Sequence, residues 1–150
     1  MFRRFFAAVA AAGAVALVPA VAMAADNQKV SVLGPGAAPD AFAQVKRTHG
    51  EVTFKVHDAN LNAGTYRYQV AVFNHPENCV AHTPFSQCTP GPDSNAATGF
   101  AFTRGTFTVD KDHFEFTVPA SLVTDVDGAE VGFGYATSAA DARMIFTDPR

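Results

Sequence analysis

Hydrophobic and polar residues alternate along most of the chain beyond residue 51. In the segment 52–57 (VTFKVH) the even positions are apolar and the odd positions are polar, and this period of two predicts a strand with one buried face. The segment 65–73 (TYRYQVAVF) alternates in the same way until Ala71 and Phe73 make its second face apolar as well. We therefore expect the end of this strand to be covered on both sides.

The alternation resumes at residue 100, and its phase changes within a few residues. The phenylalanines of 100–102 lie in one phase, whereas the apolar residues of 107–109 lie in the other. Because side chains of a strand repeat every second residue, we interpret Arg104-Gly105 as a bulge or a short turn that resets the pleat. The alternation of 106–118 on both sides of a polar turn predicts a hairpin.

The remaining segments complete an all-β pattern. Residues 25–49 predict a tethered strand at 29–33 followed by a loop, since Gly and Pro interrupt the pattern there. A single helical turn is expected at 119–123, and short strands are expected at 131–135 and 143–147. With about seven or eight short strands and no amphipathic helix, the sequence favours an antiparallel immunoglobulin-like β-sandwich, and a small β-barrel is the alternative.

The first 24 residues have the pattern of a secretory signal peptide. Arg3 and Arg4 precede an uncharged run over 5–18, and Ala22-Met23-Ala24 offers a small-residue cleavage site. We therefore expect residues 1–24 to be removed and residues 25–150 to form a single domain. This leader predicts secretion, to the extracellular space or the periplasm, and no membrane attachment after cleavage.

Charge and composition narrow the function classes. Without the two leader arginines, nine basic residues face 14 acidic ones, which leaves a net charge of about −5. A mildly acidic chain without a basic stripe is not expected to bind nucleic acid, nor to bind an anionic membrane surface. The 14 phenylalanines and the absence of tryptophan suit a β-sheet core.

Both cysteines lie in one proline-rich loop, which raises the question of metal binding. Cys79 and Cys88 are the only two cysteines of the chain, so an oxidising compartment predicts a disulfide between them. Zinc is an alternative, with His75 and His82 beside the two sulfurs. A blue-copper site is another, in which Cys79, His82 and Gln87 imitate a copper loop. The upstream ligand of that copper site would be His49 or His57.

Other polar groups favour structural roles. His113 beside Asp112 is expected to be a solvated turn residue, and Asp125-Val126-Asp127 begins a calcium-loop pattern that lacks its later ligands, so a plain turn is favoured. Four carboxylates flank strands and are expected on the exterior: Glu51, Asp58, Glu115 and Glu130.

No pair of these groups is recognisable as an acid and a base, and no hydrolase, zinc-protease or phosphate-loop motif occurs in the sequence. Tyr66 and Tyr68 are the aromatic residues that could form a ligand face rather than core. The sequence therefore predicts a protein that is not an enzyme and needs no cofactor.

The stretch GTYRYQVAVFNHPENC resembles a loosely defined set of secreted bacterial proteins of unknown role. That set carries a GLxPGxxYTxWWVxFNNPExC-type stretch, a second nearby cysteine and a late GAEV-type strand. The matching residues are Leu61, Gly64, Tyr66, Val72, Phe73, Asn74, Pro76, Glu77, Cys79, Cys88 and Gly128-Ala129-Glu130-Val131. Gln69-Val70 replaces the tryptophan pair and His75 replaces the second asparagine. The resemblance implies a secreted β-rich domain and ties the two cysteines to each other rather than to histidines.

Taken together, these patterns predict a secreted, non-catalytic interaction module. Its contact surface is expected on the stapled loop, at His75, Glu77, His82 and Phe85. The expected partner is an extracellular protein or ligand whose identity the sequence does not specify.

Overall fold

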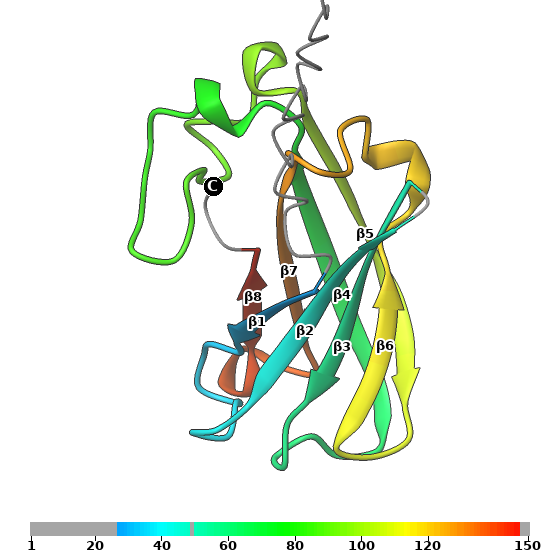
Figure 1. The fold of residues 1–150 in the computed structure, drawn as a ribbon. Coiled ribbons are helices and arrows are strands. Elements are labelled where there is room, and N and C mark those ends of the chain that lie inside the picture. The colour runs from blue at the N-terminus through cyan, green and yellow to red at the C-terminus, as the bar shows by residue number, and fades with distance from the viewer. Residues whose placement is uncertain (1–26, 49, 148–150) are drawn as a thin grey trace, which may run out of the picture.

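The computed structural model describes residues 27–48 and 50–147. These residues form eight antiparallel strands in two four-stranded sheets (Figure 1). The strands are β1 (Asn27–Ser31), β2 (Phe42–Thr48), β3 (Glu51–His57), β4 (Gly64–Phe73), β5 (Phe100–Val109), β6 (His113–Thr117), β7 (Glu130–Ala136) and β8 (Arg143–Phe146). One sheet has the order β1-β2-β3-β6 and the other has the order β5-β4-β7-β8. The all-β prediction is confirmed.

Only short 3-10 turns interrupt the strands in the described part of the chain: η1 (Pro76–Asn78), η2 (Ala96–Thr98), η3 (Ala120–Leu122) and η4 (Ala139–Asp141). The turn expected at 119–123 is confirmed by η3. None of the described helical segments is long and apolar enough to span a membrane. The signal peptide at 1–24 lies outside the described residues.

The two sheets share one hydrophobic core. Alternate residues of each strand point into it, as the period of two predicts, so that Phe54 of β3 stacks on Phe133 of β7 with ring centroids 5.5 Å apart. Phe116 of β6 stacks on the other sheet in the same way, 4.5 Å from Phe133. Tyr66 is buried and Tyr68 is half-buried among these rings, so both belong to the core rather than to a ligand face.

The strand β2 was not expected, and the reason is Arg47. Its inward positions hold Ala43 and Val45 and then Arg47, which breaks the apolar alternation although its side chain is buried. The guanidinium donates to the carbonyls of Val126, at 2.6 Å, and Ala129, at 2.8 Å. The prediction of a loop over this segment was therefore wrong, because these partners lie about 80 residues away along the chain.

The change of phase in β5 has a different cause from the expected bulge. All ten residues of β5 pair one to one with β4, from Gly64 opposite Val109 to Phe73 opposite Phe100. Phe100 and Phe102 simply lie on the outer face of the sheet, whereas Phe107 and Val109 face the core. The bulge prediction was wrong because it assumed that only one face of the strand could carry large apolar side chains.

The predicted hairpin at 106–118 was also wrong. β5 pairs with β4 in one sheet, whereas β6 pairs with β3 in the other. The turn between β5 and β6 therefore crosses from sheet to sheet. Residue patterns give each strand's period but not its partner, which depends on the rest of the chain.

Two carboxylates expected on the exterior are buried. Asp58 is 2% exposed and forms an ion pair with Arg143, with 2.7 Å between Oδ2 and Nε. Its Oδ1 accepts hydrogen bonds from the backbone N–H groups of Ala38 and Asn60. The group is thus paired on both oxygens, which is how a buried charge is accommodated. Glu130 is the second, and it lies under the loop described next.

Candidate functional site

The disulfide loop, residues 74–99, joins β4 to β5 and stands out from one end of the sheets (Figure 1). Cys79 and Cys88 are bonded to each other, with Cα atoms 5.2 Å apart, so the predicted disulfide is confirmed. The sulfur atoms pack on Ala71 and Phe73, with Phe100 beside them. The end of β4 is therefore covered on both faces, as its apolar pattern predicts.

Asp93 organises the loop from within. Its side chain is fully buried, and its two oxygens accept hydrogen bonds from the backbone N–H groups of Val80 (2.8 Å), Ala81 (3.3 Å) and Thr89 (2.8 Å). Burial alone would raise the pKa of this carboxyl, but the three N–H donors outweigh it and hold the pKa below its ordinary value. One carboxylate thus ties the start of the disulfide-bonded ring to the residue that follows Cys88.

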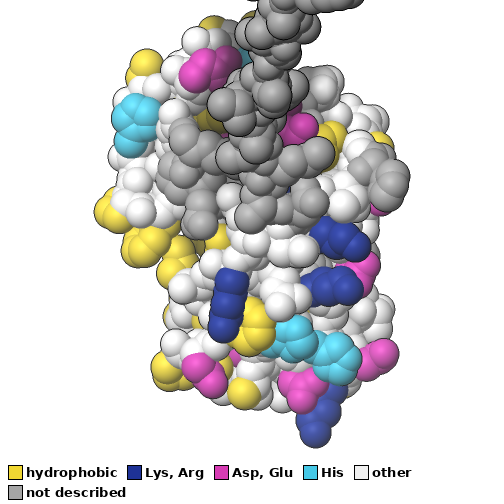
Figure 2. Space-filling model, viewed as in Figure 1, with side chains coloured by type: hydrophobic (Ala, Val, Ile, Leu, Met, Phe, Trp, Pro, Cys, Tyr) yellow, Lys and Arg dark blue, Asp and Glu magenta, His cyan; other side chains and the backbone are white. Residues whose placement is uncertain are grey.

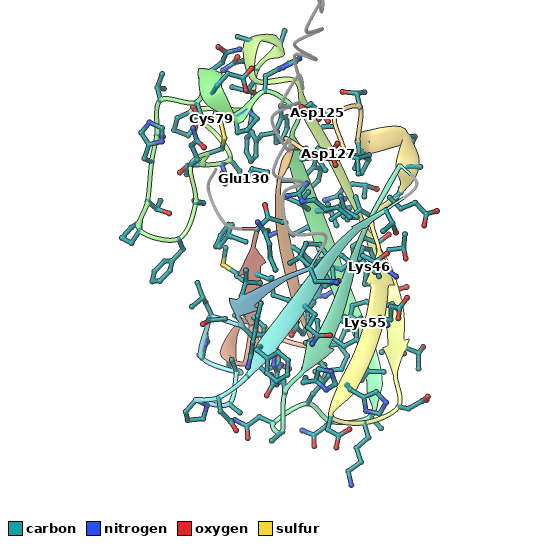
Figure 3. The ribbon with its side chains drawn as sticks, in the orientation of Figure 1. Lys46, Lys55, Cys79, Asp125, Asp127 and Glu130 are labelled. Atoms are coloured by element: carbon teal, nitrogen blue, oxygen red, sulfur yellow. A yellow bond between two sulfur atoms is a disulfide. The ribbon has the colours of Figure 1, made fainter. Side chains whose placement is uncertain are left out.

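Glu130, the first residue of β7, supports the same loop from the sheet (Figure 3). Its carboxylate accepts from the N–H groups of Gln87, at 2.8 Å, and Cys88, at 3.1 Å. Burial, reinforced by the nearby Asp93, raises the pKa of Glu130 despite these two hydrogen bonds. The loop is consequently held by a carboxylate from a strand more than 40 residues further along the chain.

Asn74 anchors the base of the loop. Its side-chain Nδ2 donates to the carbonyls of Gly99 (2.9 Å) and Leu122 (3.0 Å), and its Oδ1 accepts from the N–H groups of Thr124 and Asp125. The buried amide is therefore satisfied on both of its ends. Asn74, the first residue of the NHPENC stretch, thus has a structural role.

The residues expected to form the contact surface or a metal site do not converge on one point, and most of them have separate local partners. His75 pairs with Glu77, with 3.3 Å between Nδ1 and Oε1, and both side chains are exposed. Nδ1 of His82 contacts the carbonyl oxygen of Gln87 at 2.6 Å. The sulfurs of both cysteines are used by the disulfide, and no group of three or more His, Cys, Asp or Glu in residues 27–48 and 50–147 is arranged to hold a metal ion. Phe85, in contrast, is 56% exposed.

A trough runs along the outer face of the sheet β5-β4-β7-β8, from Phe85 to Arg67. The two central strands, β4 and β7, form its floor and carry small residues together with Gln69 and Arg67, whereas the outer strands β5 and β8 carry long side chains in the first two rows. Its first row across the four strands is Phe102, Ala71, Gly132 and Phe146. The second row is Arg104, Gln69, Gly134 and Met144, and the third is Thr106, Arg67 and Ala136.

The trough is a chain of three adjoining hollows of about 310, 110 and 410 Å³. Met144 lines all three, and Pro90 and Phe146 join the second hollow to the rim of the disulfide loop. Figure 2 shows hydrophobic side chains gathered at the left edge of the view, along the lower rim of the loop. Sequence reasoning found Phe85 but missed the trough, although the outward phase of Phe102 was the pattern that pointed to it.

The end of the trough far from the loop is cationic. Arg67 and Arg104 line the hollow of about 310 Å³, and both side chains are exposed. They lie on neighbouring strands, one row apart in register, since Gln69 is opposite Arg104 and Arg67 is opposite Thr106. Neither has an ion-pair partner among the described residues.

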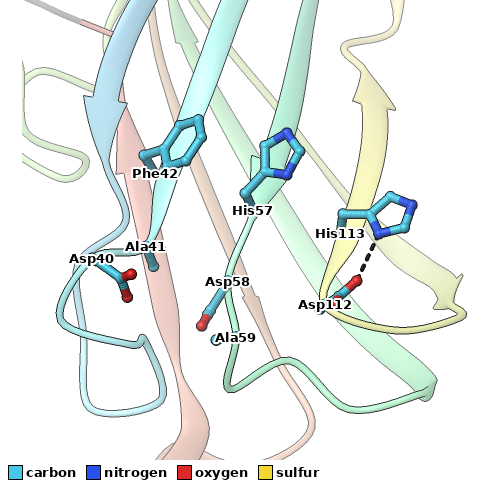
Figure 4. A pocket seen from close by; sticks show the side chains of 8 residues that line it. All are labelled: Asp40, Ala41, Phe42, His57, Asp58, Ala59, Asp112 and His113. Carbon is cyan, nitrogen blue, oxygen red and sulfur yellow. Dashed lines mark hydrogen bonds and ion pairs between the residues drawn. The ribbon is translucent and has the colours of Figure 1, made fainter.

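A separate hollow, of about 540 Å³, lies on the other sheet (Figure 4). His57 and His113 are cross-strand neighbours there, with ring centroids 6.3 Å apart. Nδ1 of His113 lies 2.7 Å from Asp112, and this hydrogen bond lowers the pKa of the Asp112 carboxyl. His57 stacks on Phe42 at 4.9 Å. His113 and Asp112 are thus bonded to each other, and the ring of His57 stacks on both Phe42 and His113.

The turn that begins a calcium-loop pattern is a hydrogen-bonded turn. Oδ1 of Asp125 accepts from the N–H of Gly128 at 3.0 Å, and its carbonyl accepts from Ala129. The carboxylate therefore stabilises the backbone of its own turn, as Asp residues commonly do.

No protein-family model matches the chain, and neither a curated protein nor a solved structure shows significant similarity to it. The resemblance of the NHPENC stretch to secreted bacterial proteins therefore stays an expectation.

Proposed function

We propose that this protein is a secreted, non-catalytic binding module that holds a partner in the trough beside the disulfide loop. One observation carries the proposal. Phe85, Phe102 and Met144 are 56%, 47% and 46% exposed, and all three line one concave surface. Three of the four large apolar side chains that the described residues expose are thus gathered in one place, and such a gathering marks an interaction site.

The proposed compartment rests on two features. The leader pattern of residues 1–24 favours export, and the Cys79–Cys88 bond is consistent with an extracellular or periplasmic location. A rigid loop also favours binding, because a contact surface that is already ordered loses less conformational entropy when the partner arrives.

We further propose that the two sheets pack as an immunoglobulin-like sandwich rather than a barrel. In such domains strands B and E are neighbours in one sheet, C and F are neighbours in the other, and the chain crosses from B to C and from E to F. Here β3 is beside β6, β4 is beside β7, and the chain crosses from β3 to β4 and from β6 to β7. β5 and β8 then correspond to C′ and G, so the trough lies on the outer face of the C′CFG sheet.

Peptide selection followed by mapping tests the binding function. Phage-displayed random dodecapeptides are selected on the purified exported protein, and enriched peptides are titrated while backbone amide shifts are recorded. We expect the largest shift changes at Gly132, Gly134 and Met144. A Phe102→Ser variant should lose binding and keep its fold, because the ring is half-exposed. Enriched peptides that bind elsewhere, or that tolerate Phe102→Ser, would contradict the proposal.

A further inference from the structure

We infer that the trough recognises an extended protein segment in which a large apolar side chain is followed, two and four residues later, by acidic side chains. The inference rests on the proposed binding function and adds the chemistry of the partner. It comes from three features of the trough: the direction and spacing of its rows, its apolar end beside the loop, and its unpaired arginines.

The rows favour an extended peptide. Successive rows are two residues apart along each strand, which is about 6.6 Å. An extended peptide laid along the strands repeats its own side-chain direction over the same distance, so its residues i, i+2 and i+4 face rows one, two and three. The three hollows adjoin along one sheet face rather than forming a single enclosed cavity, whereas sites for small molecules bury most of the ligand.

The first row selects an apolar side chain. Phe102 stands on one side and Phe146 on the other, with Ala71 and Gly132 as the floor between them. Pro90 closes this end toward the loop. A phenyl or branched alkyl side chain placed here covers the exposed part of Phe102, and burial of that apolar surface drives the contact.

The next two rows select negative charge. Arg104 stands in the second row and Arg67 in the third, each without an ion-pair partner among the described residues. Among the described outward-facing residues of β4, β5, β7 and β8, the only acid is Glu130, which is buried under the loop. The chain as a whole is acidic, with a formal net charge of −3, so two unopposed arginines on one face give charge complementarity to an acidic segment.

Three synthetic peptides test the spacing. The matched probe is fluorescein-labelled Ser-Gly-Phe-Ser-Glu-Ser-Glu-Gly. The shifted probe, Ser-Gly-Phe-Glu-Ser-Glu-Ser-Gly, has the same composition but turns both acids to the opposite side of an extended chain. The neutral probe replaces both Glu by Gln. Fluorescence anisotropy with the full mature protein should show the matched probe binding about three- to tenfold more tightly than either control, since exposed ion pairs contribute modestly.

Charge-neutralising variants then separate the arginines from the rest of the surface. Arg104→Gln and Arg67→Gln should each weaken the matched probe by about two- to fivefold and leave the neutral probe unchanged, which a double-mutant cycle reports as coupling. Lys46→Gln is the matched control. It removes one exposed positive charge from the other sheet and should change neither affinity.

The outcomes distinguish the inference from the proposed function. Equal binding of the matched and shifted probes, or equal effects of Arg104→Gln on the charged and neutral probes, would overturn the acidic-segment inference. If selected peptides lacking this spacing still bind in the trough, the binding function stands and the inference falls. A titration with decanoate, a fatty-acid carboxylate, tests a lipid as the occupant. If decanoate shifts the backbone amide signals of the trough while the peptides do not, the occupant is a lipid carboxylate and the inference is wrong. If nothing binds in the trough, both fail.

Discussion

Replacing both cysteines of the loop by alanine should lower the free energy of unfolding. The loss has two parts, the chain entropy released when the cross-link is removed and the packing lost with the two sulfur atoms. The bond joins residues nine positions apart, so it closes a ring of about ten residues. Chain entropy for a ring of that size corresponds to about 2.7 kcal/mol at 25 °C. The sulfur atoms also pack in the small cluster with Ala71, Phe73 and Phe100, and each methyl-sized void left behind costs about 1 kcal/mol.

The Cys79→Ala/Cys88→Ala variant should therefore be less stable than the oxidised protein by about 4–5 kcal/mol. Reduction of the unmodified protein removes the cross-link but keeps both sulfur atoms, so it should cost only the entropic part, about 2.7 kcal/mol. In both forms the two sheets should persist, because their shared core does not include the loop cluster.

Urea unfolding followed by far-ultraviolet circular dichroism measures all three forms. With a slope of about 1–3 kcal/mol per molar urea, reduction should lower the midpoint by about 1–3 M. If the reduced protein were as stable as the oxidised one, the hydrogen bonds to Asp93 and Glu130 alone would order the loop, and the entropic reasoning would be refuted. If reduction abolished folding, the independence of the main core would be refuted.

Other predictions concern buried polar groups. Asp93→Asn should destabilise the protein at pH 7, because an amide cannot accept all three N–H groups. The folded-state pKa of Asp93 lies below its ordinary 3.8, so the stability that its carboxylate contributes is complete above pH 3.8 and is lost as the pH falls through the folded-state value. The unfolding curves of variant and parent should therefore converge at low pH. Asn74→Asp should be less stable than Asn74→Ala at pH 7, since a carboxylate would face two carbonyls, and should recover in acid; calorimetry at two pH values measures both. Arg143→Met should cost about 3–5 kcal/mol by leaving Asp58 buried without its cation, and adding Asp58→Asn should restore part of that loss in denaturant titrations.

The strand pattern of the fold could be predicted where apolar residues occupy every second position of a segment. β3, β4 and β7 satisfy that condition and lie at the expected places. β2 does not, because an inward arginine depends on carbonyls about 80 residues away. The partner of each strand was equally out of reach, since β5 and β6 are adjacent in sequence but belong to different sheets.

The features of the candidate site likewise fall into those that local sequence predicts and those that depend on residues far away along the chain. The loop, its disulfide and the exposed Phe85 follow from local sequence and from the expected compartment. The trough depends on register, which aligns Phe102 with Gly132 and Arg104 with Gly134 across three strands. Glu130 was expected outside because nothing near it in sequence shows that Gln87 and Cys88 donate to it.

Under the proposed binding function, the glycines in the floor of the trough would allow its ligand preference to change without a change of fold. A methyl group at Gly134 would meet Gln69 at 3.5 Å, an ordinary contact, and one at Gly132 would meet the ring of Phe146 at 3.3 Å, which a small ring movement relieves. Neither glycine has a left-handed backbone, so other residues fit both positions. Single substitutions at these two positions would therefore change the depth of the trough at little cost in stability. If the trough binds a partner as proposed, such substitutions would alter which partner it accepts.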